Sequence, residues 1–136
     1  MRTNIIVIAT YYMATAVSDY GLPTYKLIFD AGTELHGADG PFLWGVPVPT
    51  TNSTTNNNQT IANIMKDWYL GFVLNLDPNS IDNSGTPKPQ WPQYQAEGQM
   101  GLTVMDVNYT MIGQTSDPDA SARCDFFHGQ SYVVRN

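Results

Sequence analysis

The sequence of 136 residues predicts an α/β fold, because runs with the pattern of buried strands alternate with runs of helical periodicity. Residues 5–9 (IIVIA) form a continuous apolar run rich in β-branched side chains, which is typical of a strand buried on both faces. Residues 24–29 (TYKLIF) predict a second strand. From Ile61 to Leu76 the apolar residues recur every three or four positions, which predicts a long amphipathic helix.

The first sixteen residues admit two interpretations. Residues 1–16 can be a short secretory signal peptide, with Arg2, an apolar stretch and a small-x-small triplet (ATA, 14–16). We favour the strand over residues 5–9, since the TYY at 10–12 makes a poor hydrophobic region for a signal peptide. A short helix is expected over residues 13–19, ending before Gly21 and Pro23.

A histidine lies on the loop that follows the second predicted strand. Residues 30–40 (DAGTELHGADG) contain three glycines and place His36 just after the carboxyl end of TYKLIF, where open α/β sheets bind ligands. Because a histidine titrates near neutral pH, it suits proton transfer. His36 is therefore the candidate catalytic residue.

The rest of the chain divides at proline, glycine and asparagine. Residues 46–60 are a low-complexity stretch of Pro, Thr and Asn that predicts an exposed loop, with Asn58 or Thr60 as the N-cap of the long helix. That helix must end at the DPN of 77–79. Residues 102–106 and 109–112 predict short strands around Asn108, before a polar turn at 116–121.

Composition excludes several classes of function. Twelve acidic and six scattered basic residues give a net charge of −6, so the basic patch of a nucleic-acid-binding protein is missing. No apolar run approaches the roughly 20 residues of a membrane span. Cys124 is the only cysteine, so neither an intrachain disulfide nor a Cys-rich zinc site can form, and no metal or cofactor is predicted. A charged fraction of only 13% fits a piece that packs against something else.

Three N-x-S/T sequons, at Asn52, Asn58 and Asn108, are candidate N-glycosylation sites. They suit a secreted glycoprotein. A chain this rich in Asn and Thr also produces sequons by chance.

An ordered series of motifs resembles the C-terminal part of the type B carboxylesterase family, the α/β-hydrolases that include cholinesterases and fungal lipases. The series covers nearly the whole chain: TYKLIF, the histidine loop G-x-E-L-H-G-A-D, the helix IANIMKDWYLGFVLNLDPN, the WPQY at 91–94 and the closing RCDFF at 123–127. Each motif alone is weak, whereas five in the family's order are a specific signal. The resemblance implies that residues 1–136 form part of an α/β-hydrolase fold, incomplete on its own.

The resemblance also implies a role for His36 as the general base of a serine esterase or lipase. In this fold the serine and the acid precede the histidine in the chain, and no G-x-S-x-G is present; residues 129–133 (GQSYV) have valine in place of the second glycine. Asp30, Glu34 and Asp39 lie near His36, but none is nominated as the acid. The chain alone is therefore not expected to hydrolyse esters, and its partner would be the missing N-terminal part of an extracellular parent enzyme.

Other residues receive structural interpretations. His128 is expected to be packed or at the surface, and Trp68, Tyr69 and Phe72 to be core residues of the long helix. The family's closing RC motif commonly pairs its cysteine with one near residues 5–12, where this chain has none, so Cys124 is either a free buried thiol or paired upstream.

Two further functions stay open. The first is a non-catalytic binding or adhesion protein of the same fold. The second is a small secreted glycoprotein whose signal peptide is residues 1–16.

Overall fold

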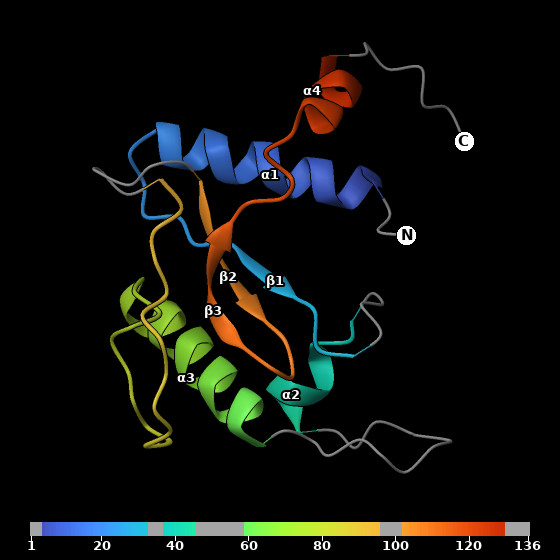
Figure 1. The fold of residues 1–136 in the computed structure, drawn as a ribbon. Helices are drawn as coiled ribbons and strands as arrows, with labels where there is room; N and C mark the ends of the chain where they lie inside the picture. Colours follow the sequence, from blue (N-terminus) through green and yellow to red (C-terminus); the bar gives the residue numbers. More distant parts are fainter. Residues whose placement is uncertain (1–3, 33–36, 46–58, 96–101, 130–136) are drawn as a thin grey trace.

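The computed structural model describes residues 4–32, 37–45, 59–95 and 102–129, with side chains from Ala9 onward (Figure 1). Helices and strands are interspersed along the chain, which confirms the mixed α/β class. In order they are α1 (Asn4–Asp19), β1 (Leu27–Phe29), α2 (Gly40–Trp44), α3 (Gln59–Asn75), β2 (Thr103–Val107), β3 (Ile112–Ser116) and α4 (Ala122–Gly129).

The strands of the described residues form a small mixed sheet in the order β1-β2-β3. β1 runs parallel to β2, with Phe29 opposite Val107, and β3 runs antiparallel to β2, with Ile112 opposite Val107. The parallel pair requires a crossover connection, and α2 and α3 lie within it. β1 is an edge of the sheet as described.

One face of the sheet packs on α3. Alternate residues of β1 and β2 point to this face and join a single core with the buried side of α3. Trp68 of α3 is fully buried there, and its ring meets Trp91 edge to face with centroids 5.1 Å apart. The core consists of Ala31, Phe42, Ile61, Ala62, Ile64, Met65, Trp68, Trp91, Met105 and Val107.

The second face of the sheet lies toward α1. Val104, which alternates with Met105, is fully buried. The ammonium of Lys26, next to Leu27, lies 5.8 Å from the ring centroid of Tyr11 in α1. Figure 1 places α1 and α4 together at one end of the molecule and α2 and α3 at the other, with the sheet between them.

The strand predicted over residues 5–9 is wrong, because these residues belong to α1. A continuous apolar run has no period of its own, so it fits a buried helix as well as a buried strand. The helix predicted over residues 13–19 is the second half of α1. Backbone hydrogen bonds at Tyr20, Gly21 and Leu22 end α1, and Gly21 adopts a φ of 82°.

The strands near Asn108 are shifted from the predicted positions. β2 extends one residue beyond 102–106, whereas β3 begins where the predicted 109–112 strand ends. The side chain of Asn108 explains the shift, because its Oδ1 accepts the backbone N–H groups of Thr110 and Met111 and forms a turn. The polar turn predicted over residues 116–121 begins one residue later, because Ser116 is the last residue of β3. The turn is followed by α4, a helix that the sequence did not predict.

The long helix predicted from the spacing of apolar residues is confirmed as α3, Gln59–Asn75. It begins two residues before Ile61, so Gln59 and Thr60, which the sequence placed in the loop, are helical, and Thr60 is not the N-cap. Asn58 lies outside the described residues. Within the described part, no helix has the length and apolar character to cross a membrane.

Candidate functional site

The histidine loop leaves the carboxyl end of a parallel strand pair. Phe29 ends β1, and the N–H of the next residue, Asp30, donates to the carbonyl of Val107 at 2.8 Å. Ala31 is then buried in the core. Gly32 has a φ of 98°, which favours glycine, and a Cβ there would lie 3.4 Å from the Tyr109 hydroxyl. Both the backbone angle and the nearby Tyr109 therefore favour glycine at position 32.

The other end of the loop returns to the same place. Gly37 also has a positive φ, 79°, and its carbonyl accepts the N–H of Gly40 at 3.0 Å. α2 begins at Gly40, and its Phe42 ring contacts the ring of Phe29 edge to face with centroids 5.2 Å apart. This contact brings the exit and the return of the loop together at the end of β1.

His36 itself, like Glu34, lies outside the described residues. Of its acidic neighbours, Asp39 precedes α2 and faces Tyr69 of α3. Burial and then the charge of Asp39 raise the pKa of Tyr69.

A buried charged cluster lies at the opposite end of β1. The Lys26 ammonium contacts the carboxylates of Asp117 at 2.7 Å and Asp119 at 2.8 Å, and all three residues are at least nine-tenths buried. The fully buried Tyr94 donates its hydroxyl to Asp117. Burial, followed by this hydrogen bond, raises the pKa of Tyr94 well above its ordinary value.

The sequence held a signal for this cluster that was missed. Lysine is almost never fully buried without a partner, so a lysine inside the apolar TYKLIF predicts a nearby carboxylate. The D-P-D at 117–119 supplies two. The Asp117 carboxylate also accepts the N–H of Asp119 at 2.9 Å, which fixes the turn before α4.

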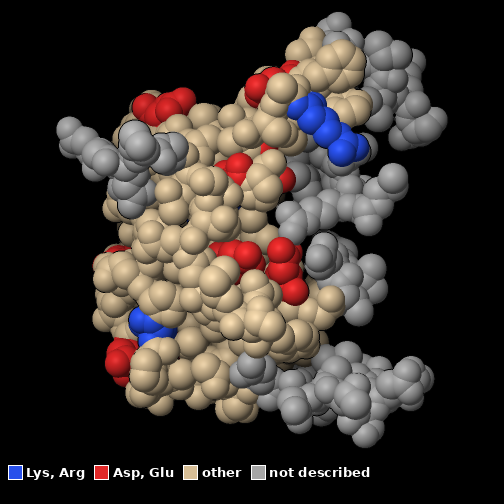
Figure 2. Space-filling model, in the orientation of Figure 1, with Lys and Arg blue, Asp and Glu red and all other residues tan. Residues whose placement is uncertain are grey.

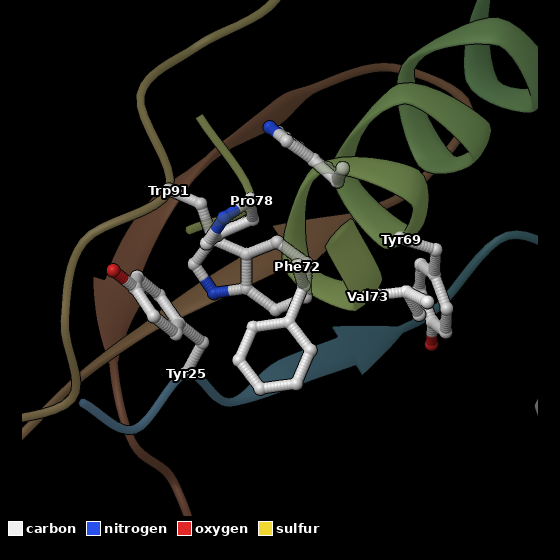
Figure 3. A pocket seen from close by; sticks show the side chains of 7 residues that line it. Tyr25, Tyr69, Phe72, Val73, Pro78 and Trp91 are labelled. Carbon is white, nitrogen blue, oxygen red and sulfur yellow. The ribbon is translucent and has the colours of Figure 1, made fainter. Parts of the chain in front are cut away.

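An apolar pocket of about 200 Å³ opens beside β1 (Figure 3). The stick view places Phe72 between two groups, with Tyr25 and Trp91 on one side and Tyr69 and Val73 on the other. Tyr69 and Phe72 are each 40% exposed, which corrects their assignment to the core, whereas Trp68 is buried as expected. The lining residues are Tyr25, Trp68, Tyr69, Phe72, Val73, Pro78 and Trp91.

The remaining sequence candidates lie apart from the loop. His128 of α4 stacks on Tyr12 of α1 with ring centroids 3.6 Å apart. Cys124 is buried and free. Asn108 is half-buried, and its Oδ1 accepts the hydroxyl of Thr110, the third residue of its sequon, at 2.8 Å. Asn52 lies outside the described residues.

The side chains of the described part are not arranged as a metal site. No group of three or more His, Cys, Asp or Glu side chains is placed to bind a metal ion in the described ranges. Figure 2 shows a face on which acidic and basic atoms are few and scattered among uncharged ones.

Compared with models of known protein families and with curated protein sequences, the chain matches none.

Proposed function

We propose that this chain is the C-terminal part of a carboxylic ester hydrolase similar to the type B carboxylesterases, with His36 as the general base. One observation carries the proposal. The segment that contains His36 begins at the carboxyl end of a parallel strand, β1. After it, Phe42 of α2 contacts Phe29 at that same end of β1. Catalytic groups of open α/β sheets occupy this position.

The proposed reaction begins with the His36 imidazole accepting the proton of a serine hydroxyl. The serine oxygen attacks the ester carbonyl, and the imidazolium then donates its proton to the departing alcohol. Water, activated by the same imidazole, hydrolyses the acyl-serine. The serine, the triad acid and the oxyanion-hole donors come from the preceding part of a longer polypeptide, since the sequence holds no G-x-S-x-G.

The first experiment reads the native transcript across the codon for Met1. A frame that continues upstream through G-x-S-x-G supports the proposal. The continuous polypeptide is then expressed and assayed with p-nitrophenyl esters of short and long acyl chains. The isolated 136 residues are the matched sample without nucleophile, and we expect no turnover from them.

The second experiment substitutes the two histidines of the chain in that longer polypeptide. His36→Asn should lower kcat by roughly 10³-fold or more, because no other group takes the serine proton. His128→Asn is the matched control, since His128 stacks on Tyr12 far along the chain from the loop, and it should leave kcat within about twofold. Equal losses from both variants, or an upstream frame without a serine motif, would contradict the proposal.

A further inference from the structure

The segment over residues 24–30, which includes β1, is hydrogen-bonded to the sheet on one side. Backbone groups at alternate positions bond toward β2 and the segment before it: the carbonyls of Thr24 and Lys26 accept the N–H groups of Tyr94 and Met105, and the N–H of Asp30 donates to Val107. The residues between these positions turn their backbone groups to the opposite side. The described part of the chain places no strand there. We call the backbone groups of Tyr25, Leu27 and Phe29 the open edge.

The side chains of the open edge are apolar. Tyr25, Leu27 and Phe29 point to the face of the sheet that packs on α3, and all three are half-buried. Natural edge strands are commonly protected by charged residues or proline, and these three positions have neither. The open edge therefore has the character of an interior strand.

The α3 helix adds an apolar wall beside this edge. Phe72 is 40% exposed, and its ring meets the ring of Tyr25 edge to face with centroids 6.0 Å apart. Val73 is 73% exposed. The apolar pocket of about 200 Å³ is lined by all three residues, and Figure 3 shows Phe72 lying over β1 with Tyr25 near the start of the strand. A side chain from a neighbouring strand on this face would enter the pocket.

The backbone groups of the open edge select the structure of the segment that covers them. Alternating N–H and C=O groups along a strand are paired by another extended chain. A helix cannot pair with them, because its own backbone groups bond within the helix. The occupant is therefore a β-strand.

The direction of α1 selects where this strand comes from. α1 lies on the second face of the sheet, and residues 20–23 join it to the segment that contains β1. In Figure 1, α1 runs from right to left and β1 from left to right, so α1 begins on the side toward which β1 points. A strand parallel to β1 would end on that side, where α1 starts. Strand, helix and parallel strand form a β-α-β unit, of which α1 and β1 are the second and third parts.

We propose that the open edge binds a parallel strand that precedes α1 in a longer polypeptide. The backbone of this strand pairs with Tyr25, Leu27 and Phe29, and one of its side chains enters the pocket beside Phe72. Because α1 and α3 lie on opposite faces, the strand is covered on both faces and should be a continuous apolar run. The proposal rests on the longer polypeptide of the proposed function, but not on ester hydrolysis.

Hydrogen exchange of single backbone amides in the longer polypeptide tests the pairing. The N–H of Asp30 is the internal reference, because it donates to Val107 within the sheet. The N–H groups of Leu27 and Phe29 should exchange within about tenfold of the Asp30 rate if a strand pairs with them. Rapid exchange at both positions, beside a protected Asp30, would overturn the proposal.

Two substitutions of Leu27 form a matched pair. Leu27→Ala and Leu27→Pro both remove the leucine side chain, but only proline removes the N–H, which β2 does not use. In the longer polypeptide, Leu27→Pro should unfold at a urea concentration lower by roughly 1 M than Leu27→Ala, because it loses a ladder hydrogen bond. In the isolated 136 residues the two variants should unfold together. Equal midpoints in the longer polypeptide would contradict the pairing.

The outcomes separate this proposal from the ester hydrolase. Protected Leu27 and Phe29 amides in a polypeptide without G-x-S-x-G keep the strand and remove the esterase, whereas a polypeptide with the motif and with both amides unprotected does the reverse. Translation that begins at Met1 would overturn the strand. Protection of the two amides in the isolated 136 residues that rises with concentration would also overturn it, because a second copy would then occupy the edge.

Discussion

Tyr12 connects α1 to α4 with one side chain. Its hydroxyl donates to the Asp125 carboxylate at 2.7 Å, and its ring stacks on His128 one turn later in α4. The hydrogen bond to Asp125 is the main cause that raises the pKa of Tyr12 to about 12. A raised phenol pKa means that the folded state favours the protonated form. The contact is therefore complete below pH 10, the ordinary pKa of tyrosine, and is lost as pH rises through about 12.

Asp125→Asn should lower the pKa of Tyr12 toward 10, because the amide removes the negative charge beside the phenol. The ¹³Cζ chemical shift of Tyr12, followed by NMR from pH 8 to 12, measures the change. Asp19→Asn removes a carboxylate from the end of the same helix and serves as the control. If Tyr12 titrates unchanged in Asp125→Asn, the hydrogen bond between Tyr12 and Asp125 does not form in solution.

The end of α3 depends on a glycine that packs against the following turn. A Cβ on Gly71 would lie 2.8 Å from the carbonyl oxygen of Asp77 and 3.1 Å from that of Pro78. The turn is held there by Ser80, whose hydroxyl donates to the Asp77 carbonyl at 2.7 Å. The helix can therefore end against its own turn only if residue 71 has no side chain.

Gly71→Ala should destabilise the fold by about 1–3 kcal/mol, because the added methyl meets backbone atoms that cannot move aside. Helix propensity alone predicts the opposite sign, a gain of about 1 kcal/mol. Thermal unfolding followed by circular dichroism measures the difference. Gly129→Ala in α4 is the control, since a Cβ there meets nothing within 4 Å, and a loss of stability in both variants would exclude the close packing as the cause.

The helices illustrate which patterns can be read from a sequence. α3 was predicted closely, because apolar residues at helical spacing fit no other element. α1 was predicted as a strand over residues 5–9, since a continuous apolar run has no spacing to distinguish the two. α4 lacks a regular apolar period, and its buried position, Cys124, gave no signal. The loop of His36 was located from glycines and its place after β1, but the contact of Phe42 with Phe29 that closes it depends on the tertiary fold.

The cluster around Lys26 holds distant parts of the molecule together. It joins the residue before β1 to Tyr94, in the segment before β2, and to the turn between β3 and α4. These partners lie far apart in the sequence, so the pairing could not be deduced from spacing. The lysine inside an apolar strand did indicate that some carboxylate lies close to it. Because Lys26 directly precedes β1, the cluster fixes the start of that strand against the turn between β3 and α4.

Lys26→Met should destabilise the protein by about 3–5 kcal/mol, because it leaves the carboxylates of Asp117 and Asp119 buried without their cation. Tyr94→Phe removes the hydrogen bond to Asp117 but leaves both ion pairs of Lys26 in place, and it should cost about 1–3 kcal/mol. Urea unfolding measures both. Lys66→Met, at an exposed position, is the control and should change stability by less than about 0.5 kcal/mol. A similar small change for Lys26→Met would show that the cluster does not stabilise the fold.

The parallel pairing of Leu27 with Met105 also affects the order in which the protein forms. The two strands are about 80 residues apart, so a ribosome working at roughly 5–20 residues per second makes β1 between 4 and 16 seconds before its partner strand. During that time α2 and α3 can form from local contacts, whereas β1 waits unpaired with the histidine loop attached. The pairing of β1 with β2, from whose carboxyl end residues 30–32 leave the sheet, is therefore completed late in synthesis, after α2 and α3 have been made.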